Sequence, residues 1–559
     1  MYNLAFFFHH VHGWELFGMT FLFGAIGDSL LMTMYNSFIS QPLENFANNY
    51  TAYFLLVPET IALTTAVLIL VLDLIKPNRD SLKAPVIAMT GSLLSLSTVY
   101  YTQYLTSRYF NPALGQYWGG LETIDPFSLF LKSIAFMGVI FAIIMSVKTR
   151  LPRKHSGEYY ALLMFATVAM TFVVSSSDVL AIWVMTEFVS LTSYIIVAFN
   201  KHEPRAVEGA LKYLLLGAIS SAFMLYGFSI LYGVTGTTNL YVMKTILVQS
   251  SKEIVNPIFV LAISMFMVGI GFKLAIAPFH TWAPDAFEGA SIPVASFIAV
   301  TPKIAVIAVF LRVFLLGLAN VATIWVPMMV GCSILSMVIG NLFAMRQNNI
   351  KRFLAYSGVA QMGFVLMGLC AAGMQSQTDP NSAIKSLGYN AILNYVVIYA
   401  IMTTGAFLIA NIVQYHTGSE DIRAYRGLFQ RAPASALTLM ICLLSLAGIP
   451  PTGGFSAKFF VFAAAISREM WLLVVVGSLM AVLAAYYYLR WIHVMFFIKP
   501  DDETLILPTT LHRWAMAIPF ILLTFTIVPI PFLGGTLAQY IYDYASGSYF
   551  LTINVYFGT

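Results

Sequence analysis

Charged side chains that can bind and release protons occur inside stretches of sequence that are otherwise apolar. The acid is Glu187, within VLAIWVMTEFVSLTSY. The bases are Lys212 in EGALKYLLLGAISS, Lys273 in GIGFKLAIAPFHTW, Lys303 in TPKIAVIAVFLRVF and Lys458 in GIPPTGGFSAKFF. Carboxylates and amines at such positions are typical of proton relays in membrane proteins. The sequence therefore contains the groups of a relay, provided that the fold brings them together.

The cost of exposing these lysines to lipid predicts where they lie. A lysine at mid-bilayer costs about 2.5–3.5 kcal/mol, so four would cost on the order of 10–14 kcal/mol, as much as the whole stability of a typical fold. We expect them to face the bundle interior or internal water. Buried ion pairs are the alternative, but the amines outnumber the one central carboxylate of Glu187. Desolvation and repulsion between like charges favour neutral amines, which eases proton exchange. A further lysine, Lys132, lies near the start of its helix, and we expect its stem to extend to the interface, outside the mechanism.

Proline and glycine interrupt two of these stretches next to a lysine. Pro278 follows Lys273 closely, and Pro450 and Pro451 precede Lys458. A proline in mid-span removes a backbone hydrogen bond and frees a carbonyl group, so both helices should be broken close to the charge. A simple proline kink is the alternative for either helix alone. Paired interruptions in the two halves of a chain are typical of inverted-repeat transporters.

The composition of the chain fits a membrane setting for these groups. Of 559 residues, 59% are hydrophobic and only 9% are charged, and the mean hydropathy is +0.82. This excludes an ordinary water-soluble enzyme, and aromatic residues at 15% fit interfacial belts better than nucleic-acid binding. Cys332, Cys370 and Cys442 lie far apart without a CxxC pair. We expect no metal, no iron–sulfur cluster and no redox centre in this chain.

Apolar runs of about 20 residues predict an all-α polytopic membrane protein with fourteen core helices. An extra N-terminal helix at Leu16–Tyr35 is an open possibility, as a crossing or an interfacial segment. Metal binding by the preceding histidines His9, His10 and His12 is disfavoured. The expected spans are Tyr53–Ile75, Ala84–Tyr104, Phe127–Val147, Tyr160–Val174, Val179–Phe199, Glu208–Tyr232, Pro257–Thr281, Ile292–Leu316, Trp325–Met345, Phe353–Ala372, Ala391–Tyr415, Ala436–Ile466, Trp471–Phe497 and Trp514–Leu533.

The distribution of basic residues between alternate loops predicts the orientation. Loops on one side, beginning with the loop after Ile75, hold eighteen Lys and Arg residues, and loops on the other side hold six, with Arg312 and Arg490 assigned to the adjoining loops. Basic residues resist translocation, so the first side is the cytoplasmic or equivalent side. The net charge of +5 follows from this topology and needs no anionic partner.

Several runs resemble those of a known family. TEFVSLTSY, EGALKYLLLGAISS, FKLAIAPFHTWAPDAFEGA, PKIAVIAVFLRVF, NNIKRFLAYSGVAQMGF, LSLAGIPPTGGFSAKF and AAYYYLRWI are similar to subunit N of proton-pumping NADH-quinone oxidoreductase, respiratory complex I. This is subunit 2 in mitochondrial naming, an antiporter-like subunit. The similarity covers roughly Tyr53 to His493, in order along the chain. The preceding fifty or so residues depart from the family pattern, and they leave the total helix number open.

The resemblance implies fourteen helices with two inverted five-helix repeats, each containing a broken helix. The implied divisions are residues 1–50 as an N-terminal extension, 51–155 as the first three core helices, 156–317 and 318–498 as the repeats, and 499–559 as the C-terminal helix and tail. The proton-translocation residues implied are Glu187 as the essential glutamate, Lys212 as its partner, Lys273 and Lys458 in the broken helices, Lys303 as the connecting lysine and His280 as a candidate participant. A capping histidine at a helix break is the alternative role for His280.

The implied function is proton translocation coupled to quinone reduction in other subunits. NADH, FMN, iron–sulfur clusters and quinone are expected in those partners, which include antiporter-like paralogues and, indirectly, a peripheral arm. The expected membrane is the bacterial plasma membrane, with thylakoid and mitochondrial inner membranes as alternatives. A subunit of a Mrp-type cation/proton antiporter, a subunit of a ferredoxin- or deazaflavin-dependent quinone reductase, and a purely structural scaffold are the other functions left open.

Overall fold

The computed structural model describes residues 55–75, 83–109, 116–147, 155–249, 257–374, 382–502 and 504–524. The N-terminal segment Leu16–Tyr35 and the histidines before it lie outside the described residues, as does the last part of the span expected at Trp514–Leu533.

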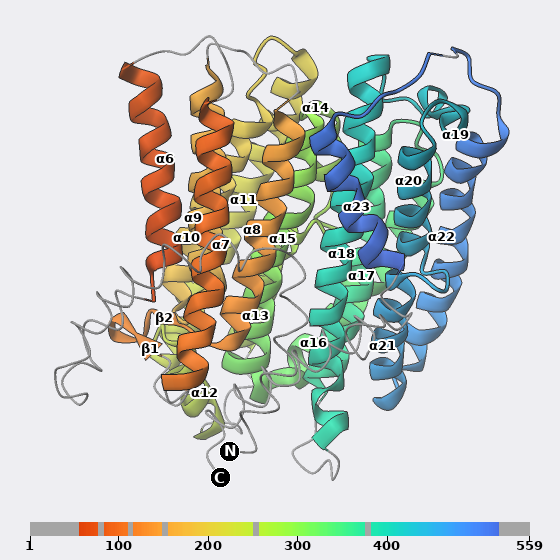
Figure 1. Cartoon of the computed structure of the whole chain (residues 1–559). Helices are drawn as coiled ribbons and strands as arrows, with labels where there is room; N and C mark the ends of the chain where they lie inside the picture. The colour runs from red at the N-terminus through yellow and green to blue at the C-terminus, as the bar shows by residue number, and fades with distance from the viewer. Residues whose placement is uncertain are drawn as a thin grey trace.

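Long helices that run side by side form one bundle (Figure 1). The helices are α6 Val57–Ile75, α7 Lys83–Tyr109, α8 Pro126–Ser146, α9 Ser156–Ser175, α10 Val179–Val197, α11 Pro204–Thr235, α12 Leu240–Gln249, α13 Pro257–Leu274, α14 Trp282–Gly289, α15 Ile292–Arg312, α16 Ala322–Ala344, α17 Ile350–Gly373, α18 Ser382–Thr417, α19 Leu428–Arg431, α20 Pro433–Ala447, α21 Gly453–Ser467, α22 Trp471–Phe497 and α23 Thr510–Thr524. This arrangement confirms the all-α fold class.

The expected spans correspond to helices throughout the described chain. Eleven helices are long and apolar enough to cross a membrane. The other three expected spans correspond to α7, to the shorter pair α20 and α21, and to the described part of α23. The chain is therefore a multi-pass membrane protein. Apolar composition over about 20 residues is a strong signal because a helix satisfies all its backbone hydrogen bonds internally.

Both expected helix breaks are present. α13 ends at Leu274 and α14 begins at Trp282, while α20 ends at Ala447 and α21 begins at Gly453. Gly448 has a φ of +83°, the left-handed conformation that ends α20 and that glycine adopts at little cost. The two expected broken helices are thus confirmed. They place loop backbone inside the bundle, beside Lys273 and Lys458.

Polar residues fix where several helices begin. The backbone N–H of Ser128 donates to the Asp125 side chain at 2.7 Å, and the Asp125 N–H donates to the Ser128 hydroxyl at 3.0 Å, which closes a capping box ahead of α8. The short strands β1 (Gln116–Tyr117) and β2 (Glu122–Thr123) form an antiparallel hairpin directly before this cap. The hairpin is the only sheet in the described residues.

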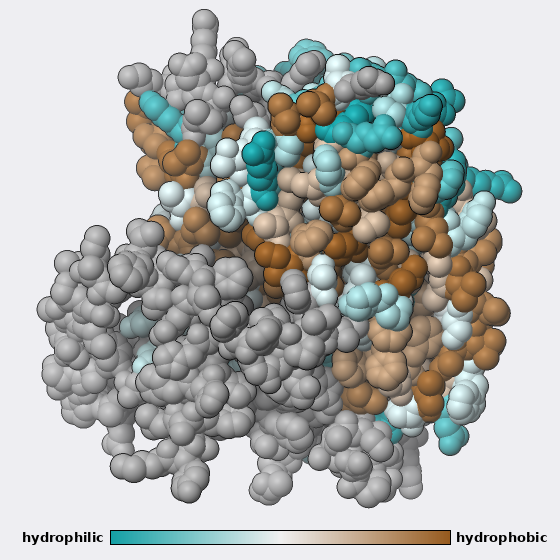
Figure 2. Space-filling view, turned by 45° about the vertical axis from the view of Figure 1, so that its right-hand side comes forward, coloured by the Kyte–Doolittle hydropathy of each residue, from teal (hydrophilic) through white to brown (hydrophobic). Residues whose placement is uncertain are grey.

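The helices differ in how far they lie inside the bundle. Every residue of α15 and nearly every residue of α17 is buried, whereas most residues of α22 are not. Figure 2 shows a broad hydrophobic surface below a hydrophilic rim, as expected for a surface that contacts lipid. α14 and α19 lie at one end of the bundle, and the β1–β2 hairpin and α12 lie at the other (Figure 1). α15, which carries Lys303, is therefore an inner helix of the bundle.

Candidate functional site

Glu187 and Lys273 form an ion pair between α10 and the last turn of α13. The Lys273 Nζ lies 2.7 Å from Glu187 Oε1, and it also donates to the Ser190 hydroxyl at 2.9 Å. The lysine side chain is 6% exposed and the glutamate side chain 21% exposed. The partner of Glu187 in this structure is thus the lysine of the first broken helix.

Lys212, expected to act with Glu187, does not contact Glu187 in this structure. Lys212 Nζ lies 2.7 Å from Asp285 Oδ2 and 2.8 Å from Glu208 Oε1, and its side chain is 45% exposed. Asp285 lies on α14 and also pairs with Arg352 at 2.8 Å. Lys212 therefore belongs to a partly exposed charge network at the α14 end of the bundle. The physical reason is that α11 is an outer helix, most of whose residues are not buried, so its lysine lies outside the buried centre.

Side chains satisfy the backbone at the first helix break. The Trp282 Nε1–H donates to the Phe272 carbonyl oxygen at 2.9 Å, and the Ala277 N–H donates to the Ser336 hydroxyl at 2.9 Å. Pro278 lies within this break, and His280 is buried there with an Nδ1 atom that has no hydrogen-bond partner among the described residues. This nitrogen remains available to a proton donor or acceptor that the break can admit.

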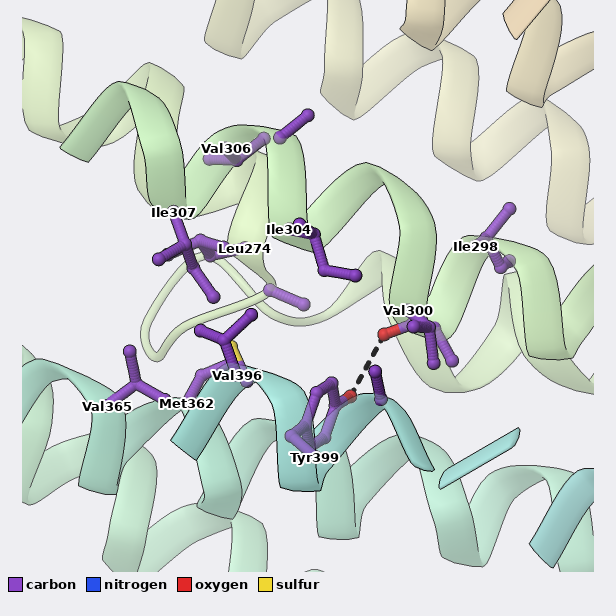
Figure 3. Close-up of a cluster of buried hydrophobic side chains, with 14 of the residues drawn as sticks. Leu274, Ile298, Val300, Ile304, Val306, Ile307, Met362, Val365, Val396 and Tyr399 are labelled. Carbon is purple, nitrogen blue, oxygen red and sulfur yellow. Dashed lines mark hydrogen bonds between the residues drawn. The ribbon is translucent and has the colours of Figure 1, made fainter. Parts of the chain in front are cut away.

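Lys303 lies at the middle of α15 without a counter-charge in the described chain. Its Nζ is 3.5 Å from the Tyr399 hydroxyl, and a Cβ at Gly358 would lie 3.1 Å from the same nitrogen. Figure 3 shows the apolar side chains of α15 that face Tyr399, whose hydroxyl donates to the Ala299 carbonyl oxygen at 3.0 Å. A permanent charge here would be costly, which is the setting expected of a group that exchanges a proton and not of a structural ion pair.

Lys458 binds the carbonyl groups that the second helix break frees. Its Nζ lies 3.1 Å from the Leu446 oxygen and 2.8 Å from the Ala447 oxygen, at the C-terminal end of α20. The unpaired carbonyls of a helix C-terminus carry partial negative charge, so they suit an ammonium group. Pro450 and Pro451 lie in the linker that turns the chain back into α21.

Polar side chains connect the second break to α17, α18 and α22, and they were not predicted from the sequence. The Gln361 amide donates to the Leu446 oxygen at 2.9 Å, and the Tyr395 hydroxyl donates to the Gln361 side-chain oxygen. The Tyr488 hydroxyl lies 2.5 Å from the Ser357 hydroxyl and 3.4 Å from the Gln361 amide nitrogen. A signal was present, since AYSGVAQMGF places a serine and a glutamine in a buried helix, but neutral polar residues did not stand out beside the lysines.

The chain is similar to known membrane proteins. Residues 176–484 match the family described as NADH:quinone oxidoreductase/Mrp antiporter, transmembrane region. The chain belongs to this family. The chain is 34% identical over 499 residues to NADH-quinone oxidoreductase subunit N 2 of Symbiobacterium thermophilum, covering 87% of this chain and 96% of that protein. It is 37% identical over 391 residues to NADH-quinone oxidoreductase subunit N of Desulforamulus reducens, covering 69% and 78%.

A solved structure agrees with these relatives. A chain of respiratory complex I from Thermus thermophilus with bound Aureothin superposes with a TM-score of 0.69 at 27% identity, covering 84% of this chain and 96% of that one. The resemblance to subunit N is thereby confirmed. The matched family region includes all the predicted residues from Glu187 to Lys458.

The expectation that Lys132 extends to the interface is wrong; this lysine precedes the matched family region. Lys132 does not extend to the interface, because its side chain is 1% exposed and its Nζ lies 2.7 Å from Glu59 Oε1 on α6. Arg312, assigned to a loop, is likewise buried, and its Nη2 lies 2.9 Å from Asp125 Oδ1. In both cases an acid from a distant part of the chain makes burial of the base possible.

Proposed function

We propose that the chain is the proton-translocating, antiporter-like subunit of a membrane NADH-quinone oxidoreductase. The observation that carries this proposal is the position of Lys303. It lies at the middle of a fully buried span, without an ion pair in the described chain, between helices that carry the Glu187–Lys273 pair and Lys458. A buried base between two helix breaks is suited to pass a proton from one to the other.

The packing of helices supports an order for the transfer. α13 contacts α15, α15 contacts α18, and both α17 and α18 contact α21. Opening of the Glu187–Lys273 pair would release Lys273 to give its proton toward Lys303 through internal water. The hydroxyl and amide groups of Tyr399, Ser357 and Gln361 would then extend the line toward Lys458. Groups linked by one or two waters exchange protons without large motion of the backbone.

The energy for opening the pair would come from outside this chain. Quinone reduction in partner subunits would change the charge or hydration near Glu187, and the relay would respond by redistributing protons. The names of relatives include NADH and quinone, which supports such partners. NADH, FMN, iron–sulfur clusters and quinone would be held by other subunits, and the neighbours of this chain would be other membrane-arm subunits. We place the complex in a bacterial plasma membrane.

Two substitutions test this function in reconstituted or native membrane vesicles. Glu187→Gln and Lys273→Met should each lower proton pumping and coupled electron transfer while the complex still assembles. Glu158→Gln is a matched control, because Glu158 is an exposed carboxylate whose ion-pair partner among the described residues is His155. Unchanged pumping in both variants would contradict the relay, and loss of assembly in both would favour a structural ion pair.

A Mrp-type cation/proton antiporter is the second candidate function, since the matched family description includes such antiporters. Identification of the co-purified polypeptides separates the two functions. A peripheral arm with flavin and iron–sulfur proteins supports the oxidoreductase, and its electron-input module distinguishes NADH from ferredoxin or deazaflavin. Sodium-dependent transport without such an arm supports the antiporter.

A further inference from the structure

The buried pair of Lys132 and Glu59 lies apart from the line of lysines in the repeats. The two side chains come from α8 and α6, are each 1% exposed, and approach to 2.7 Å. The pair carries no net charge. By itself it would be a structural contact between two helices.

A second buried carboxylate adds a charge to this pair. Glu122 on β2 is 6% exposed, and its Oε1 accepts a hydrogen bond from the Ser176 hydroxyl at 3.0 Å. Its Oε2 is buried and has no hydrogen-bond partner in the part of the chain that the structure describes. Lys132 lies in the second turn of α8, which begins directly after the hairpin, so its charge and that of its partner Glu59 act on this carboxyl group. With both acids ionised the three side chains carry one net negative charge, and one added proton makes the cluster neutral.

The surroundings of Glu122 favour proton binding. Burial raises the pKa of Glu122 to about 7, and the charge of Glu59 acts in the same direction, while hydroxyl groups of Ser175 and Ser176 and the charge of Lys132 lower it. Arg312 of α15 faces the neighbouring part of the hairpin, where its Nη2 donates to the Thr123 carbonyl oxygen at 3.4 Å, but its ion-pair partner is Asp125.

The position of the cluster gives the proton a route to water. The β1–β2 hairpin lies at the end of the bundle opposite α14 (Figure 1), and Leu121, next to Glu122, is 44% exposed. Arg205 and Arg352, which belong to the basic loops, pair with acids of α14, so the orientation expected from the sequence puts the hairpin end toward the other compartment. In the described part of the chain, Glu122 therefore lies one residue from a side chain that is exposed at that end.

We propose that Glu59, Lys132 and Glu122 form a second proton-binding site, which takes one proton from the compartment opposite the basic loops and returns it there. The proton binds at Glu122 Oε2, and no other bond forms or breaks. The site does not depend on the relay proposed above, since its residues lie on α6, β2 and α8.

Infrared difference spectroscopy of the purified complex that contains this chain tests the site. The wild-type complex is titrated through neutral pH, and the spectrum of a Glu122→Gln complex is subtracted to cancel the other carboxyl groups. We expect a carboxyl C=O band that is present below neutral pH and lost above it. A Glu158→Gln complex, altered at an exposed carboxylate, serves as the control and should retain this band.

Two further variants distinguish a proton site from a structural cluster. Glu59→Gln removes a like charge, so the band should disappear at a lower pH than in wild type. Lys132→Met removes an opposite charge, so the band should persist to a higher pH. Opposite shifts are not expected of two variants that merely loosen packing.

The proposal is overturned if the wild-type complex shows no titrating band absent from Glu122→Gln, or if the band is unmoved in Glu59→Gln. If Glu122→Gln does not assemble, the wild-type and Glu59→Gln titrations decide the question, because a band that does not shift between them belongs to another group. Neither outcome bears on pumping by the lysine line, which is measured separately.

Discussion

The Nζ of Lys458 lies 2.8 Å from the carbonyl oxygen of Ala447, the last residue of α20. The break that interrupts this span therefore supplies the hydrogen-bond acceptors for the lysine of the following helix, α21. Broken helix and buried base form one unit, because a continuous helix would have used the same carbonyl groups for its own hydrogen bonds. The predictions below concern this unit and the residues that lead to it.

Substitution of Gly448 tests the geometry of the second break. A Cβ at this position would lie 2.7 Å from the Lys458 Cδ, and the residue has a φ of +83°. Gly448→Ala should lower pumping severalfold because it displaces the lysine stem. Gly236→Ala is the matched control: Gly236 also has a left-handed φ, +67°, but no atom of the described residues lies within 4 Å of its Cβ position.

Both glycine variants carry a backbone strain of about 1–2 kcal/mol, so both should lower the thermal stability of the complex slightly. Only Gly448→Ala should reduce the rate of proton uptake by vesicles. Equal pumping by the two variants would show that the position of Lys458 does not matter.

Removal of the Tyr399 hydroxyl tests the step from Lys303. Tyr399→Phe deletes the polar group nearest to the Lys303 amine and leaves the ring in place. We expect pumping to fall about threefold or more, since one hydrogen-bonded step of the line is lost. Tyr226→Phe, at a ring that is 56% exposed, should pump as wild type. The line does not pass Tyr399 if both variants behave alike.

The pairing of Lys212 is tested by a double-mutant cycle. Lys212 contacts Asp285 and Glu208 but not Glu187. The effect of Lys212→Met on electron transfer should therefore shrink in an Asp285→Asn background and stay the same in a Glu187→Gln background with residual activity. The reverse pattern would show that Lys212 is coupled to Glu187 and not to Asp285.

How far the sequence predicts this structure depends on the range of the interaction concerned. The spans and both breaks follow from local features, namely apolar runs of helix length and prolines such as Pro278 within them. The acids that pair with buried bases do not follow from local features. Glu59 lies in α6 and Lys132 in α8, so only the packing of these helices reveals the pair.

Position near a helix end was a poor guide to exposure for the same reason. Lys132 lies in the second turn of α8, where a lysine ordinarily extends to the interface, but α8 is an inner helix here and most of its residues are buried. Lys212 lies in the third turn of α11 and is partly exposed, because α11 lies at the periphery. The depth of a helix within the bundle is a tertiary property that local hydropathy does not contain.

The central claim is that buried bases carry protons and do not merely hold helices together, and Lys303→Met tests it most directly. Lys303 forms no ion pair in the described chain, so methionine breaks no such contact, and assembly and thermal stability should be preserved or slightly improved. The measurement is the number of protons pumped per NADH oxidised in sealed vesicles. The account predicts that this ratio falls clearly below the wild-type value in a fully assembled complex; a wild-type ratio in that complex would contradict it.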